Sequence, residues 1–148
     1  MNRNLRIGEV LTEKGYVTEK QMTQALAYQK EHRDMRVGQI LRELGFVTEN
    51  QVLDALASRL NLKIVDVAQL SVDLTAVGMV SREVAEKNLM LPISVQGHHM
   101  VLVTNDPLNY FALEEVRQQT GCQLEICLSE EKPLKKAVSY YYAEVSAR

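Results

Sequence analysis

Residues 6–29 read RIGEVLTEKGYVTEKQMTQALAYQ, and residues 36–59 read RVGQILRELGFVTENQVLDALASR. Aligned without gaps, the two segments are identical at 12 of 24 positions. Self-similarity at a fixed period indicates a duplicated structural unit. Because two repeats are too few for an extended solenoid, the pair predicts one compact, pseudo-symmetric unit.

Each repeat predicts a short helix, a glycine stop and a longer helix. Apolar residues recur at helical spacing in both parts of the repeat, and a Thr-x-x-Gln capping box precedes each longer helix. In the first repeat we expect an N-cap at Asn4, a helix stop at Gly15 and a capping box at 18–21. In the second repeat the equivalent features are expected at Asp34, Gly45 and 48–51. We therefore expect residues 1–62 to form a four-helix unit of two repeated helical hairpins.

The remaining residues, 63–148, predict a small mixed α/β subdomain with about three strands, which makes the whole chain α+β. Two apolar, β-branched runs joined at Gln96-Gly97 read as a hairpin. An alternating segment after Gly121 reads as a third strand, and residues 63–67 as a short strand or an extended link. Helices are expected at 70–79, 81–87, 109–120 and from Ser129 onward.

Composition excludes several classes of function. A net charge of −2 and a pI near 5.9 argue against broad binding to nucleic acid, which needs an extended basic surface. No run approaches eighteen apolar residues, and no apolar stretch follows the first charged residues, so we expect neither membrane insertion nor a signal peptide. Cys122 and Cys127 are five residues apart in an expected strand, so their side chains should point to opposite faces; this disfavours a disulfide and favours a reducing cytoplasm. No CxxC or clustered Cys/His pair predicts a metal site.

No catalytic constellation is apparent. The chain has no GxxxxGK[ST] sequence to hold ATP phosphates, so it is not expected to be an ATPase or another enzyme by itself. His98-His99 reads as an edge-strand pair, and Glu130-Glu131 as the acidic first turn of a helix.

The informative residues are Arg6 and Arg36, each followed by an apolar residue, Ile7 or Val37, and a glycine. Each arginine lies near a helix start, where free backbone N–H groups favour an anion. Gly8 and Gly38 each cost a helix roughly 1 kcal/mol relative to alanine, which suggests that something approaches the backbone there. The alternative is tight packing between helices, with both arginines in ordinary surface pairs.

The two repeats resemble the tandem Arg-Leu-Gly…Gly…Leu…Leu…Gln motif of the N-terminal domain of secretion and pilus-assembly ATPases. The downstream segments LPISVQGHHMVLVTNDPLNYFALEEVRQQTG and KKAVSYYY resemble the rest of that domain. In its MshEN subset the motif binds cyclic di-GMP, with arginines and glutamines on guanine and phosphate. The resemblance thus implies that cyclic di-GMP is the ligand and that no cofactor is needed. The implied binding residues are Arg6, Ile7, Gly8 and Gln29 in the first repeat, and Arg36, Val37, Gly38 and Arg59 in the second.

The chain departs from the motif at Arg59, which stands at a glutamine position. Glutamine offers a donor and an acceptor, whereas arginine offers donors only. Arg59 can still pair with a phosphate, but a contact that needs an acceptor would be lost. This departure favours a second interpretation, in which the domain docks on an inner-membrane platform protein without binding nucleotide. In either case the resemblance implies a regulatory partner of the ATPase motor domain, in the cytoplasm and peripheral to the inner membrane.

Overall fold

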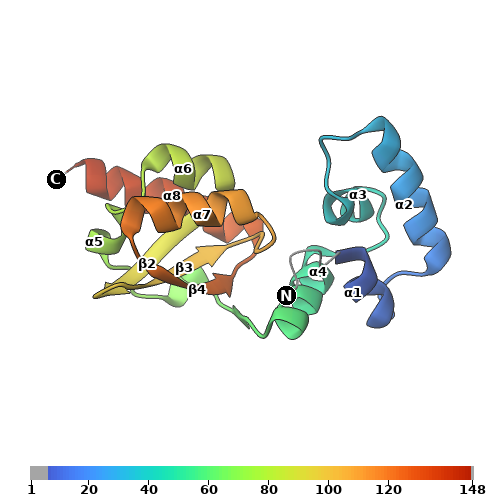
Figure 1. Cartoon of the computed structure of the whole chain (residues 1–148), viewed down its shortest axis with the longest axis horizontal. Coiled ribbons are helices and arrows are strands. Elements are labelled where there is room, and N and C mark those ends of the chain that lie inside the picture. The colour runs from blue at the N-terminus through green and yellow to red at the C-terminus, as the bar shows by residue number, and fades with distance from the viewer. Residues whose placement is uncertain (1–6, 148) are drawn as a thin grey trace. The chain divides into compact units, whose positions relative to one another are not determined.

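The structure is a computed structural model that describes residues 7–147 (Figure 1). The chain divides into two compact units, one ending at Asn61 and the other beginning at Leu62. The first unit is helical, and the second combines helices with a mixed sheet of four strands. The α+β class predicted from the sequence is therefore confirmed.

The described part of the first unit, residues 7–61, contains four helices: α1 (Ile7–Glu13), α2 (Glu19–Glu31), α3 (Val37–Glu43) and α4 (Glu49–Leu60). Both longer helices begin with the predicted capping box, because Thr18 and Thr48 each exchange two hydrogen bonds with the glutamine three residues on. Gly15 and Gly45 have φ values of 76° and 78°, as the residue after a helix end often does.

The predicted cap of α3 is wrong by two residues. The N-cap is Arg36, in extended conformation and without a side-chain cap, whereas Asp34 lies in the preceding turn. Arg36 takes this position because its carbonyl oxygen accepts the first helical hydrogen bond, from the amide of Ile40 at 3.0 Å. The equivalent prediction for Asn4 falls outside the described residues.

The helices of the first unit pack across the repeats. The short helix α1 packs on α4, the short helix α3 packs on α2, and α1 also contacts α3. Exchanging the two repeats turns one of these pairings into the other, which is the pattern of a pseudo-two-fold arrangement. The core that results is built from both repeats and centres on Val10, Leu11, Ile40 and Leu41.

The sheet of the second unit has the strand order β1-β4-β3-β2. Its strands are β1 (Lys63–Ile64), β2 (Met90–Gln96), β3 (His99–Thr104) and β4 (Gln123–Leu128). The predicted hairpin is present, since β2 runs antiparallel to β3 through the turn at Gly97. β4 is parallel to both β3 and β1, so the segment expected as a strand or a link supplies a fourth, two-residue strand.

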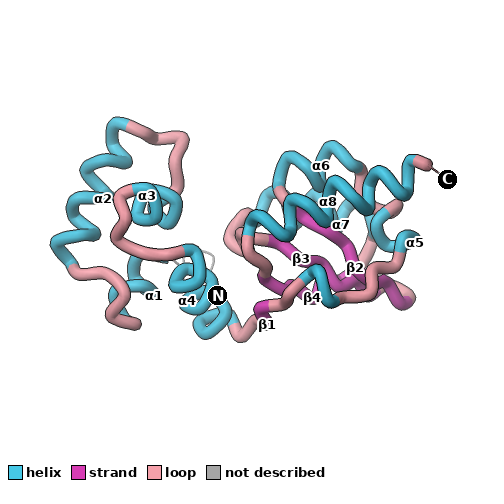
Figure 2. The backbone as a smooth tube through the Cα atoms, turned by 180° about the vertical axis from the view of Figure 1, so that it is seen from behind, coloured by secondary structure: helices cyan, strands magenta, loops and turns pink. Residues whose placement is uncertain are grey.

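The helices of this unit are α5 (Leu74–Val77), α6 (Arg82–Asn88), α7 (Tyr110–Thr120) and α8 (Glu131–Ser146), with a single 3₁₀ turn, η1, at Val67–Gln69. In both Figure 1 and Figure 2, α6, α7 and α8 lie together above the strands. The crossover between the parallel strands β3 and β4 is α7, which Asn109 caps and Gly121 ends. Helix α5 covers part of β2.

Helix α8 buries one stripe in the core of the second unit. Leu134, Val138 and Tyr142, four residues apart, are almost fully buried. The Tyr142 hydroxyl donates a hydrogen bond of 3.0 Å to the carbonyl oxygen of Val80, and burial raises the pKa of this phenol. The outward side of the same helix stays in solvent and carries a cluster of lysines.

Among residues 7–147, no helix combines the length and the apolar character that crossing a bilayer requires.

Candidate functional site

The starts of α1 and α3 meet in a reciprocal contact. A side-chain carbon placed on Gly38 would lie 3.7 Å from Cγ2 of Ile7, and one placed on Gly8 would lie 3.8 Å from Cγ1 of Val37. Each repeat thus sets its apolar residue beside the glycine of the other repeat. Four of the residues predicted for the site come together here, about the pseudo-two-fold relation of the unit.

The two glycines have different surroundings. At Gly8, the thioether of Met22 fills the space that a side chain would need. At Gly38, the nearest atoms belong to Ile7 at ordinary van der Waals distance, so a methyl group would fit. The flexible end of Met22 therefore supplies a packing contact at Gly8, whereas no described residue makes so close a contact at Gly38. Sequence reasoning missed the role of Met22; its length relative to Val52, the equivalent residue of the second repeat, was the available signal.

Arg36 and Gln29 belong to one local cluster. The Gln29 side chain donates a hydrogen bond of 3.0 Å from Nε2 to the carbonyl oxygen of Met35, the residue before Arg36. This bond ties the end of α2 to the entry of α3, and Arg36 itself is exposed at that entry. Because Gln29 uses a donor in this bond, its side-chain oxygen is still able to accept a hydrogen bond from a ligand.

In the second repeat, Arg59 stands at the position equivalent to Gln29 and makes a different contact. Arg59 forms an ion pair of 3.0 Å with Glu13, at the far end of α1, and both side chains are largely exposed. Exposed pairs of this kind contribute at most about 1 kcal/mol, so Glu13 holds Arg59 only weakly. Arg6, the partner of Arg36 in the repeat, falls outside the described residues.

A second polar cluster joins the turn after α1 to α4. Asp54 accepts hydrogen bonds from the Tyr16 hydroxyl and from the Lys14 ammonium group, the latter at 3.1 Å. The bond from Tyr16, followed by that from Lys14, holds the pKa of Asp54 below its usual value, and the same bond raises the pKa of Tyr16. The equivalents of Tyr16 and Lys14 in the second repeat are Phe46 and Leu44, so this network breaks the pseudo-symmetry.

The other candidates offer little chemistry. His99 pairs with Glu125 on the neighbouring strand at 3.2 Å, and more than half of each side chain is exposed. Across the part of the chain that the structure describes, no three His, Cys, Asp or Glu side chains are placed to hold a metal ion. Both cysteines are buried free thiols, and burial raises the pKa of Cys127.

Two solved structures share the fold of this chain. A structure of MshE with cyclic di-GMP superposes with a TM-score of 0.83 and 34% sequence identity, covering 93% of this chain and 99% of that one. The N-terminal domain of XpsE gives a TM-score of 0.76 at 22% identity, over 93% of this chain and 94% of that one, which shows a shared fold. The fold is thus that of the N-terminal domains of such secretion and pilus ATPases.

The sequence of the second unit shows to which family the chain belongs. The sequence pattern of the MshEN domain matches residues 60–148, and the chain belongs to this family. The match leaves the two repeats outside it. The type IV pilus assembly ATPase PilB of Myxococcus xanthus is 30% identical over 80 residues, which are 54% of this chain and 14% of that protein.

Proposed function

We propose that this chain is a regulatory sensor domain of a secretion or pilus assembly ATPase, and that it binds cyclic di-GMP through its two Arg-x-Gly repeats. The observation that carries the proposal is the reciprocal contact between the starts of α1 and α3. It sets Ile7 and Gly8 beside Val37 and Gly38, in a pairing that matches the approximate two-fold symmetry of the ligand. The 34% identity to MshE, whose structure holds this nucleotide, supports the same ligand.

The residues of the cluster suit a guanine nucleotide. Arginine can bond bidentately to O6 and N7 of guanine, stack on the base or pair with a phosphate. In the proposed site Arg6 and Arg36 make these contacts, while Ile7 and Val37 supply apolar surface. Gly38 lets the ligand approach the backbone closely, since no side chain in the described part of the protein packs tightly enough against it to require a glycine.

The remaining contacts are unequal in the two halves. Gln29 lies next to Arg36 and offers an acceptor through its side-chain oxygen. Arg59 would have to leave Glu13 to reach a phosphate, at a cost of no more than about 1 kcal/mol. The partner that reads the signal is the motor domain, provided that two motor states differ in their affinity for the nucleotide.

Calorimetric titration with cyclic di-GMP, beside GTP, ATP and cyclic di-AMP, tests this function. We expect binding of cyclic di-GMP alone, with a loss of about tenfold or more in Arg36→Ala, the size of one good bidentate contact. The matched control is Arg33→Ala, which removes the same charge from an exposed position three residues away. Equal loss in both variants would point to charge alone, and no heat with any of the nucleotides in the wild-type protein would rule out the sensor.

The second candidate function is a docking module that binds no nucleotide. Two observations favour it: Met22 already fills the space beside Gly8, and Arg59 is paired with Glu13. In this case the domain attaches the ATPase to the cytoplasmic part of an inner-membrane platform protein. The test is fluorescence anisotropy with that purified cytoplasmic domain, with and without cyclic di-GMP. Binding that is equal in Arg36→Ala and in the wild type would favour docking.

A further inference from the structure

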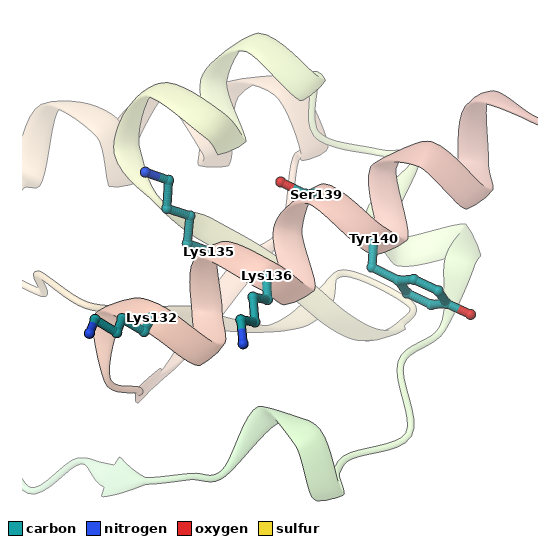
Figure 3. Close-up of a pocket in the computed structure, with 5 residues that line it drawn as sticks. All are labelled: Lys132, Lys135, Lys136, Ser139 and Tyr140. Atoms are coloured by element: carbon teal, nitrogen blue, oxygen red, sulfur yellow. The ribbon is translucent and has the colours of Figure 1, made fainter.

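The outward side of α8 carries a shallow hollow far along the chain from the repeats. Its volume is about 640 Å³, and five residues of one helix line it: Lys132, Lys135, Lys136, Ser139 and Tyr140. Figure 3 shows these side chains fanning out from α8, with the lysines toward one end and the Tyr140 ring toward the other. Nothing in the proposed nucleotide site uses this surface.

The three lysines concentrate positive charge in an acidic unit. Residues 62–147 contain 7 Lys and Arg against 11 Asp and Glu, and three of the seven fall within positions 132–136. All three are exposed, and within residues 7–147 none of their ammonium groups has a carboxylate at ion-pair distance. Lysines three and four positions apart on a helix repel one another, so the fold gains nothing from this grouping.

An aromatic ring extends the basic surface. Tyr140 lies four residues after Lys136, on the same side of α8, and 58% of it is exposed. It packs edge-on against Tyr141, which holds the ring in place. The hollow therefore offers positive charge at one end and an aromatic face at the other. Tyrosine is enriched at protein interfaces, and complementary charge guides the choice of partner.

The same features argue against other occupants. A helix that lies on a membrane must free its apolar face, whereas Leu134, Val138 and Tyr142 are buried in the core. Nucleic acid needs a broader basic surface than three lysines on an acidic unit. Charge complementarity instead fits a short acidic segment of a protein.

We propose that the hollow on α8 is a docking site for an acidic peptide segment of a partner protein, with carboxylates on the lysines and an apolar side chain against Tyr140. The hollow belongs to the second unit and shares no residue with the proposed nucleotide site, whose residues all belong to the first. Its charges are exposed, so binding weakens as salt increases.

The probe is a fluorescein-labelled peptide of glutamates around one central phenylalanine, followed by fluorescence anisotropy and by amide NMR shifts. We expect shifts confined to residues around 132–140, and an affinity that falls about threefold to tenfold in Lys132→Gln/Lys136→Gln. The matched control, Lys20→Gln/Lys87→Gln, makes the same change in net charge at two exposed lysines outside the hollow and should bind as the wild type does. Tyr140→Ala keeps the charge and should also weaken binding.

Several results would overturn the proposal: no binding of the peptide, equal losses in both lysine variants, or NMR shifts outside α8. Vesicles containing phosphatidylserine serve as the competing probe, and binding to them that depends on Lys132 and Lys136 would assign the surface to a membrane. Thermal unfolding of each variant, and its titration with cyclic di-GMP, separate a loss of this site from misfolding or from damage to the nucleotide site.

Discussion

The thioether of Met22 occupies the space that a side chain on Gly8 would need, whereas Gly38, the equivalent glycine of the second repeat, meets only Ile7 among residues 7–147, at 3.7 Å. One position of the repeat is therefore explained by packing within the protein. The other has no such explanation, and a ligand is the proposed reason for its glycine. Because of this difference, alanine at Gly38 should affect stability and ligand binding in opposite directions, and alanine at Gly8 provides the comparison.

Gly38→Ala should raise the free energy of unfolding of the ligand-free protein by about 0.4–1 kcal/mol, because alanine restricts the unfolded chain and its methyl group fits. The same variant should bind cyclic di-GMP more weakly, since the methyl group occupies the proposed approach to the backbone. Urea unfolding and calorimetric titration measure the two effects. Gly8→Ala is the comparison, and it should lack the gain because Met22 has to move. Unchanged nucleotide affinity in Gly38→Ala would remove the ligand explanation for this glycine.

Arg59→Gln should tighten binding of cyclic di-GMP by about threefold to tenfold, the worth of one recovered hydrogen bond. The change restores an acceptor at the second-repeat position and gives up only the exposed pair with Glu13. Arg59→Lys is the control, because lysine also lacks an acceptor and should bring no gain. If lysine and glutamine behave alike in the titration, release from Glu13 is the cause and the acceptor is irrelevant.

Asp54→Asn should lower the thermal stability of the protein at neutral pH. The Tyr16 hydroxyl and the Lys14 ammonium group hold the pKa of Asp54 below its usual value of 3.8, so the carboxylate stabilises the folded state fully above about pH 4. That contribution is lost as the pH falls through the folded-state pKa. The difference in melting temperature between wild type and variant should therefore shrink below about pH 4.

Circular dichroism melts from about pH 3 to about pH 7 measure this effect. Asp34→Asn serves as the control, because it makes the same substitution at an exposed carboxylate in the turn before α3. A constant difference between Asp54→Asn and the wild type across this range would mean that Asp54 acts by packing and not through its charge.

Tyr142→Phe should destabilise the second unit by about 1–3 kcal/mol, because it leaves the carbonyl oxygen of Val80 without its hydrogen bond in the core. Tyr140→Phe, on the exposed side of the same helix, should change stability by less than about 0.5 kcal/mol. Urea unfolding of the two variants makes the comparison. Equal effects would mean that the Val80 carbonyl finds another partner, such as water.

The elements that could be predicted from the sequence are those set by local chemistry. The capping boxes at Thr18 and Thr48, the glycine stops and the hairpin at Gly97 all follow from a few neighbouring residues. The errors lie where tertiary contacts decide. The expected helix at 109–120 does not reveal which apolar residues it buries: Phe111 is 94% exposed, while Ala112, Leu113 and Val116 form the buried stripe. The pairing of helices across the repeats also depends on distant contacts, and no local pattern encodes it.

The candidate site could be predicted only as a set of residues. Alignment of the repeats placed Ile7, Gly8, Val37 and Gly38 in equivalent positions, and the structure brings these four together. The asymmetry of the site was not predictable. It depends on Met22 reaching Gly8 and on Glu13 reaching Arg59, contacts made by long side chains from other turns of the unit.

Each short helix packs on the long helix of the other repeat, and this pairing has a consequence for the origin of the unit. A single repeat, with one short and one long helix, has no partner for either of its apolar faces. Two separate copies of that repeat could bury both faces by the same exchange, as a symmetric dimer held together only by packing. Joining the copies in one chain removes the need for two molecules to meet. It also allows the two halves to differ, as they do at Tyr16 and Phe46 and at Gln29 and Arg59.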